Sequence, residues 1–131
     1  MLSKQQHIEY WVKTSEEDWS AVETLFAAKK YLHCLFFAHL VLEKLCKAHW
    51  VKSREENIPP KIHNLIILVR QSNINLSEEM LMFMGEFNDF QLQGRYPDYM
   101  NKIYKVCTKE YTAELLENVK EIRQCLLKML Q

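Results

Sequence analysis

The sequence contains few of the residues that interrupt helices. Its 131 residues include only two glycines and three prolines, the residue types that most often end a helix or form a tight turn. This composition favours long helices over a turn-rich β fold.

No apolar run approaches the roughly 20 residues that a membrane-spanning helix needs, and residues 1–11 lack the apolar segment of a signal peptide. We therefore expect a cytoplasmic protein without membrane contact.

The chain also lacks an excess of charge of either sign. It has 17 basic and 17 acidic residues, so its formal net charge is zero. There is therefore no global electrostatic attraction to nucleic acid or to an anionic membrane, and such binding would need a local patch. An apolar fraction of 48% in a chain of this length is enough for one domain with its own core. We expect residues 1–131 to form a single domain.

The cysteines do not form a recognisable metal or redox motif. The four residues are scattered, at Cys34, Cys46, Cys107 and Cys125, and no C-x-x-C pair occurs. Three of them fall within helical apolar patterns, where a free cysteine behaves as a small hydrophobic side chain. We expect reduced structural thiols, as is usual in the cytosol, and no disulfide.

The spacing of apolar residues predicts two long helices at the start of the chain. Residues 3–30 have one apolar face, in which Trp11 and Trp19 are expected to anchor the core. Residues 31 to about 54 follow after a corner at residues 29–31, and a short link favours antiparallel neighbours. The second segment is apolar on nearly every side between residues 32 and 42, which is typical of a buried central helix.

Residues that break or cap helices divide the remainder of the chain. They are Pro59, Pro60, Asn73, Asn75, Ser77, Gly94, Pro97 and Thr108. We expect a third helix over residues 61–72, a fourth that is capped by Ser77 and ended by Gly94 and Pro97, and a last helix capped by Thr108. The predicted fold is an all-α, up-and-down bundle of about five helices, four long and one short.

A polar stripe crosses the otherwise apolar second helix. His39, Glu43 and Lys47 are four residues apart and therefore lie on one face. They could form a core network in which His39 and Glu43 satisfy each other and Lys44 and Lys47 extend to solvent. Alternatively, the stripe could bind an anion or a nucleotide. A metal site would need a third ligand, and neither HExxH nor ExxH occurs, so we expect no metal.

Two further segments have the composition of a ligand site. His63 follows the proline loop near a helix start, close to Lys61, where free backbone N–H groups favour anions; the alternative is a capping role. Arg95 offers a planar set of donors for phosphate or carboxylate, and the ring of Tyr96 could stack on a base. The alternative is a rigid turn, held by a bond from Arg95 to Asp98 or to the backbone. The chain contains no P-loop, GxGxxG or GxSxG motif, so no motif identifies a reaction.

Four features together resemble the HEPN domain family, a nucleotide-binding domain of higher eukaryotes and prokaryotes. A W-x3-S-x2-D-W pattern lies in the first helix, and an F-x-x-H/Q-x3-E-K-x-x-K-A pattern lies in the second. A proline loop then leads to a His-x-Leu sequence, and an Arg-Tyr-Pro-Asp loop follows. The residues are Trp11, Ser15, Asp18 and Trp19; Phe36, His39, Glu43, Lys44, Lys47 and Ala48; Pro59, Pro60, His63 and Leu65; and Arg95 to Asp98.

The resemblance implies a helical bundle of about five helices that commonly forms a homodimer. Related HEPN proteins often act beside a separate minimal nucleotidyltransferase, as toxin–antitoxin-like pairs. Other branches are ribonucleases with an Arg-x4-6-His motif. Here none of the four arginines, Arg54, Arg70, Arg95 and Arg123, is followed by a histidine at that spacing. The resemblance therefore implies binding of a nucleotide or RNA, without the ribonuclease motif.

We therefore predict a non-catalytic module that binds a nucleotide or another phosphate-bearing ligand and needs no cofactor. The candidate ligand-binding residues are His39, Glu43, Lys47, His63, Arg95, Tyr96 and Asp98. In this prediction Lys47 and Arg95 hold the phosphate, and Asp98 holds Arg95. One alternative is an interaction protein whose polar residues are structural. The other is a ribonuclease that uses His63 or His39 as its base.

Overall fold

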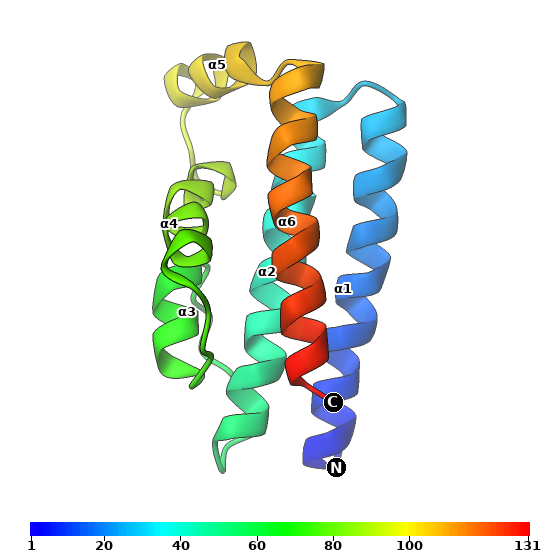
Figure 1. Cartoon of the computed structure of the whole chain (residues 1–131), viewed down its shortest axis with the longest axis vertical. Coiled ribbons are helices and arrows are strands. Elements are labelled where there is room, and N and C mark those ends of the chain that lie inside the picture. Colours follow the sequence, from blue (N-terminus) through cyan, green and yellow to red (C-terminus); the bar gives the residue numbers. More distant parts are fainter.

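The computed structural model describes all 131 residues, which form helices and no strands. The elements are α1 (Lys4–Ala27), α2 (Tyr31–Ser53), α3 (Leu65–Gln71), α4 (Glu78–Phe87), the 3₁₀ turn η1 (Asn88–Phe90), α5 (Pro97–Val106) and α6 (Lys109–Met129). Figure 1 shows α1, α2 and α6 packed along one another, with α3 and α4 on one side of the bundle. Helix α5 crosses the end opposite the two termini (Figure 1). The predicted all-α bundle is confirmed.

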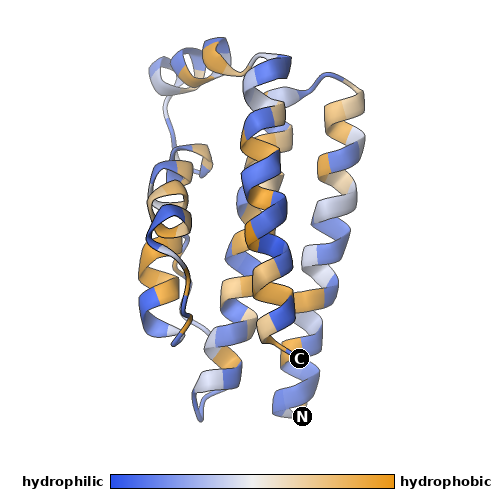
Figure 2. Ribbon diagram, viewed as in Figure 1, coloured by the Kyte–Doolittle hydropathy of each residue, from blue (hydrophilic) through white to orange (hydrophobic).

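Helix α2 is the centre of this bundle. Fifteen of its 23 residues are buried, and it contacts α1, α3, η1 and α6. Because it contains no glycine or proline and is apolar on nearly every side, it can pack against neighbours all round. In contrast, α1 and α6 alternate between hydrophobic and hydrophilic segments along their length (Figure 2). The predicted buried position of the second helix is confirmed.

The two ends of the α1–α2 pair are held by defined contacts. Ser3 and Gln6 form a reciprocal capping box at the start of α1. Next to it, Lys4 Nζ donates to the carbonyls of Val51, at 2.8 Å, and Arg54, at 2.6 Å, at the end of α2. At the other end α1 stops at Ala27, before the predicted limit of residue 30, because Lys29 adopts a left-handed φ of 62°. The predicted corner at residues 29–31 is confirmed.

The third helix is shorter than the sequence pattern predicts. Residues 61–64 are not helical, because the Asn64 side chain caps α3 by accepting from the backbone N–H groups of Ile66 and Ile67. The N–H of Leu65 donates to the side chain of Asn88, so α3 starts beside the end of α4 and the two helices are antiparallel. Ser77 caps α4 as predicted, by accepting from the N–H of Met80.

The expectation that Gly94 and Pro97 end the fourth helix is wrong. Helix α4 already stops at Phe87, and η1 carries the chain on to Phe90. Gly94 adopts a φ of +75° in the loop that follows, and Pro97 is the first residue of α5, where a missing N–H has no cost. Helix α5 was not predicted from the sequence. Its inward residues Met100 and Ile103 pack on the core without being fully buried. Thr108 caps α6 as predicted.

The aromatic and sulfur-containing residues partly follow the predictions. Trp19 packs against the core cluster, but Trp11 does not. All four cysteines are free thiols. Burial raises the pKa of Cys34 and Cys46 to about 12, so both remain protonated, apolar side chains. No helix combines the length and the apolar character needed to cross a bilayer.

Candidate functional site

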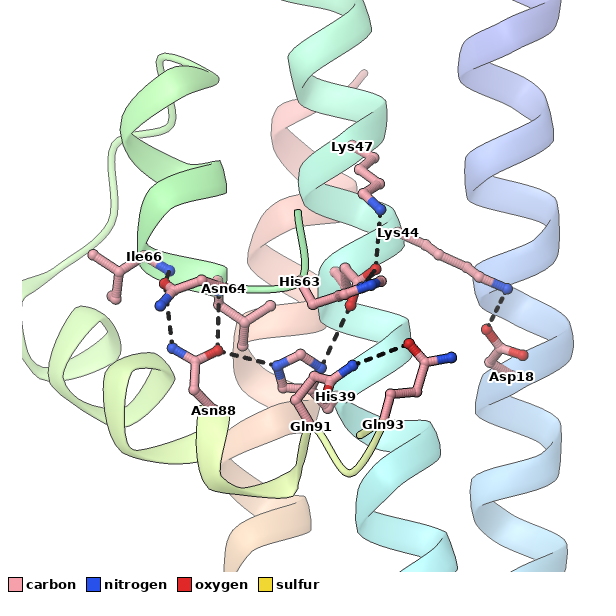
Figure 3. Close-up of polar contacts among 12 residues, drawn as sticks. Asp18, His39, Lys44, Lys47, His63, Asn64, Ile66, Asn88, Gln91 and Gln93 are labelled. Carbon is pink, nitrogen blue, oxygen red and sulfur yellow. Dashed lines mark hydrogen bonds and ion pairs between the residues drawn. The ribbon is translucent and has the colours of Figure 1, made fainter. Parts of the chain in front are cut away.

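The carboxylate of Glu43 is the centre of a polar network on α2. Figure 3 labels its neighbours His39, Lys47 and His63. Glu43 is only 3% exposed. Its Oε2 atom accepts a hydrogen bond from Lys47 Nζ at 3.0 Å and lies 2.9 Å from Nδ1 of His63. Its Oε1 atom lies 3.7 Å from Nδ1 of His39. The structure thus joins four of the seven predicted site residues, including one from outside the helix.

Lys47 neutralises this buried carboxylate. Its side chain is 8% exposed, so the expectation that its ammonium group extends to solvent is wrong. Nζ also lies 5.5 Å from the ring centroid of Trp11 on α1, a distance at which the ring face attracts a cation. Lys44 likewise pairs across the helices, at 2.7 Å from Asp18. Both lysines therefore connect α2 to α1.

His39 is joined to Asn88, a residue that no sequence motif indicated. His39 Nε2 lies 3.1 Å from Asn88 Oδ1, and the same oxygen accepts the backbone N–H of Leu65 at 3.0 Å. A backbone N–H is always a donor, so the Asn88 atom that accepts it must be the amide oxygen. His39 Nε2 faces the same oxygen and therefore carries a proton. Asn88 lies 49 residues from His39 in the chain, and no local pattern connects them.

The other ring nitrogen of His39, Nδ1, has no hydrogen-bond donor facing it. Neither Nδ1 of His39 nor Oε1 of Glu43 has a hydrogen-bond partner, although the two atoms face each other. Burial lowers the pKa of His39, and the contacts with Asn88 and Glu43 oppose this effect only in part. The neutral ring therefore presents a lone pair to the carboxylate. Protonation of Nδ1 would place a hydrogen between the two atoms, at the cost of burying a charge.

Of the four residues joined at Glu43, only His63 is exposed to solvent. Its side chain is 44% exposed, compared with 0% for His39 and 4% for Glu43. It stands in the segment before α3, one residue ahead of the cap Asn64, and its Nδ1 donates to Glu43. In the neutral ring Nε2 is then an acceptor. Among Glu43 and its three neighbours, His63 is therefore the side chain that a ligand from solvent can contact.

The other three predicted site residues are not joined to the network. No hydrogen bond or ion pair connects Arg95, Tyr96 or Asp98 to it, and the expected Arg95–Asp98 pair is absent. Instead, Arg95 Nε donates to the carbonyl of Gln91 at 3.2 Å, and its guanidinium group stacks 4.3 Å from the ring centroid of Tyr99. Tyr96 is 81% exposed at the start of α5. These three residues are exposed and form a surface without polar contacts to the network.

The network does not have the arrangement of a metal site. No group of three or more histidine, cysteine, aspartate or glutamate side chains is placed to hold a metal ion. His39, His63 and Lys47 instead each lie against the carboxylate of Glu43. The chemistry of the network is that of hydrogen bonding and charge pairing.

The chain is similar to a known protein family. The family model described as HEPN domain matches residues 8–130, which is nearly the whole chain. No curated protein and no solved structure matches the chain.

Removal of the central carboxylate should destabilise the protein. We expect Glu43→Gln to lower the free energy of unfolding by about 3 kcal/mol, because Lys47 becomes a buried charge without its partner. The double variant Glu43→Gln, Lys47→Met should recover part of this loss. Asp18→Asn is a control from the more exposed pair with Lys44 and should cost less. Denaturant unfolding at pH 7 measures all three; equal losses in the single and double variants would contradict the assignment.

The buried histidines should make the protein sensitive to acid. Burial lowers the pKa of His39 and His49 in the folded state, so below about pH 6.5 the unfolded chain binds more protons. Stability should fall as the pH decreases from there, by up to about 1.4 kcal/mol per pH unit for each proton. His39→Gln retains a donor for Asn88 but does not titrate, so it should show a shallower decline between pH 7 and 5. An unchanged decline, equal to that of the control His7→Gln, would refute this.

Proposed function

The chain belongs to the HEPN family, and on this premise we propose that it is a non-catalytic module that binds a nucleotide or another phosphate-bearing ligand. The observation that supports this proposal is the position of His63. A buried, charge-balanced carboxylate holds Nδ1 of its ring at 2.9 Å, while the side chain is 44% exposed. A ring oriented in this way presents Nε2 to a ligand at low entropic cost.

The proposal assigns different roles to the residues of the network. His63 contacts the ligand: neutral Nε2 accepts from a ribose hydroxyl, and the protonated ring donates to a phosphate oxygen. His39, Glu43 and Lys47 are buried and act through His63 as positioning residues. Arg95, Tyr96 and Asp98 belong to the separate surface at the start of α5, where Arg95 and Tyr96 suit contacts with phosphate and base.

A ligand titration followed by the imidazole signals in NMR tests this proposal. Adenosine and guanosine 5′-phosphates at millimolar concentration should shift the His63 signal, whereas the signal of His7, on α1 outside the network, should remain in place. His63→Ala should abolish the response of the neighbouring backbone. If the His63 signal does not move with any nucleotide, the role proposed for His63 is wrong. RNA incubated with the protein should stay intact. If the protein cleaves RNA and His63→Ala does not, the ribonuclease alternative is supported.

A second role, association with another protein, is supported by a groove between α1 and α6. Its volume is about 440 Å³, and its apolar lining includes Ile8 and Val12 from α1, Leu127 from α6 and Leu130, the residue that follows α6. We propose that this groove takes part in pairing, either with a second copy of the chain or with a minimal nucleotidyltransferase. Covering the groove with a partner would remove these apolar side chains from water, which favours association.

Substitution within this groove tests the association. Ile8→Glu places a charge on the apolar lining and should shift a dimer towards monomer in light scattering. Tyr10→Glu is the matched control, because Tyr10 is 55% exposed on the same helix and does not line the groove. A wild-type protein that is monomeric at every concentration, and that does not bind an added nucleotidyltransferase, would contradict this role.

A further inference from the structure

A second site with the character of an anion pocket lies at the far end of the bundle. The turn between α1 and α2 meets the end of α5 there, at the end opposite the two termini (Figure 1). Between them is a cavity of about 380 Å³, lined by Lys29, Lys30, Tyr31, Tyr104 and Lys105, with His33 and Cys107. None of these residues belongs to the Glu43 network.

The charges around this cavity are all of one sign. Three lysines line it and no acidic residue does. None of the three lysines forms an ion pair with a carboxylate within 4.0 Å. Burial also raises the pKa of Cys107 to about 11, so its thiol adds no negative charge near neutral pH. The cavity is thus a local basic patch in a chain whose formal net charge is zero.

The backbone places one of these lysines in an unusual conformation. Lys29 follows the end of α1 with a φ of 62°, a position at which glycine is the common residue. The N–H of Lys30 closes the turn on the carbonyl of Leu25 at 2.8 Å. This turn brings two consecutive lysines to the cavity, opposite Lys105 of α5.

The cavity also offers an aromatic surface. Tyr104 is 66% exposed, and Tyr31 lines the same cavity. Exposed aromatic rings beside unpaired cations are the combination that binds a phosphate together with the base attached to it. The volume of about 380 Å³ lies near the lower end of the range for small-ligand sites, which suits one nucleotide and not a long polymer.

From this arrangement we propose that the cavity binds the phosphate of a nucleotide, with Lys29, Lys30 and Lys105 on the phosphate and Tyr104 stacked on the base. The inference rests on the proposed function for the class of ligand, but it assigns a second site that is independent of His63. The same chemistry fits a free mononucleotide and the 5′-phosphorylated end of an oligonucleotide. Both have one terminal phosphate beside one base.

Imidazole NMR separates this cavity from the Glu43 network, because His33 reports on the first and His63 on the second. Adenosine 5′-monophosphate should shift the His33 signal, and adenosine should have little effect. The double variant Lys29→Gly, Lys105→Gln should weaken the affinity measured at His33 at least tenfold. Glycine suits the left-handed φ of residue 29, so this change should not unfold the turn. Lys120→Gln, an exposed lysine on α6, should leave the affinity unchanged.

If a 5′-phosphorylated five-residue oligoadenylate binds more tightly than the mononucleotide, the result supports the cavity and indicates that its ligand is the 5′ end of an RNA. A nucleotide response at His63 but none at His33 would overturn the cavity and leave the proposed function in place. No response at either histidine would overturn both. Binding to vesicles containing phosphatidylserine, lost in the double variant without any nucleotide response, would overturn the cavity as a nucleotide site.

Discussion

The buried carboxylate of Glu43 is the constraint on which the polar part of this structure depends. A charge at 3% exposure in an apolar bundle is stable only with a counter-ion and hydrogen-bond donors. Lys47 supplies the charge and His63 supplies a second donor. Because His63 belongs to the connection between α2 and α3, that connection must return to the middle of α2. The need to satisfy one carboxylate thus helps to position a loop and the helix that follows it.

The network extends this constraint to the other side of the bundle. His39 reaches Asn88 in η1, and Asn88 in turn holds the start of α3 through the N–H of Leu65. Phe87, the last residue of α4, stacks near His39 with 6.1 Å between ring centroids. The polar contacts therefore share one region with the apolar core, and a change in His39 protonation would act on the packing of α3 and η1 as well as on Glu43.

The fold was predictable from the sequence where each helix is long and periodic. The limits of α1 and α2 were right within a few residues, and the caps Ser77 and Thr108 were identified correctly. Helix α5 was missed because Gly94 and Pro97 are breakers in most contexts, and a proline is equally suited to a first turn. Arg95 was expected to pair with Asp98, but it stacks on Tyr99 instead, since local sequence does not determine which of several partners a long side chain takes.

The sequence by itself determined the helical class, the central position of α2 and the alignment of His39, Glu43 and Lys47, because helical periodicity is a local property. Only the tertiary structure decided that His63 and Asn88 join that stripe, and that Arg95, Tyr96 and Asp98 do not. It alone brought Lys29 and Lys30 together with Lys105, more than 70 positions later in the chain. Such juxtapositions depend on how the helices pack, and neither composition nor spacing along the chain records that packing.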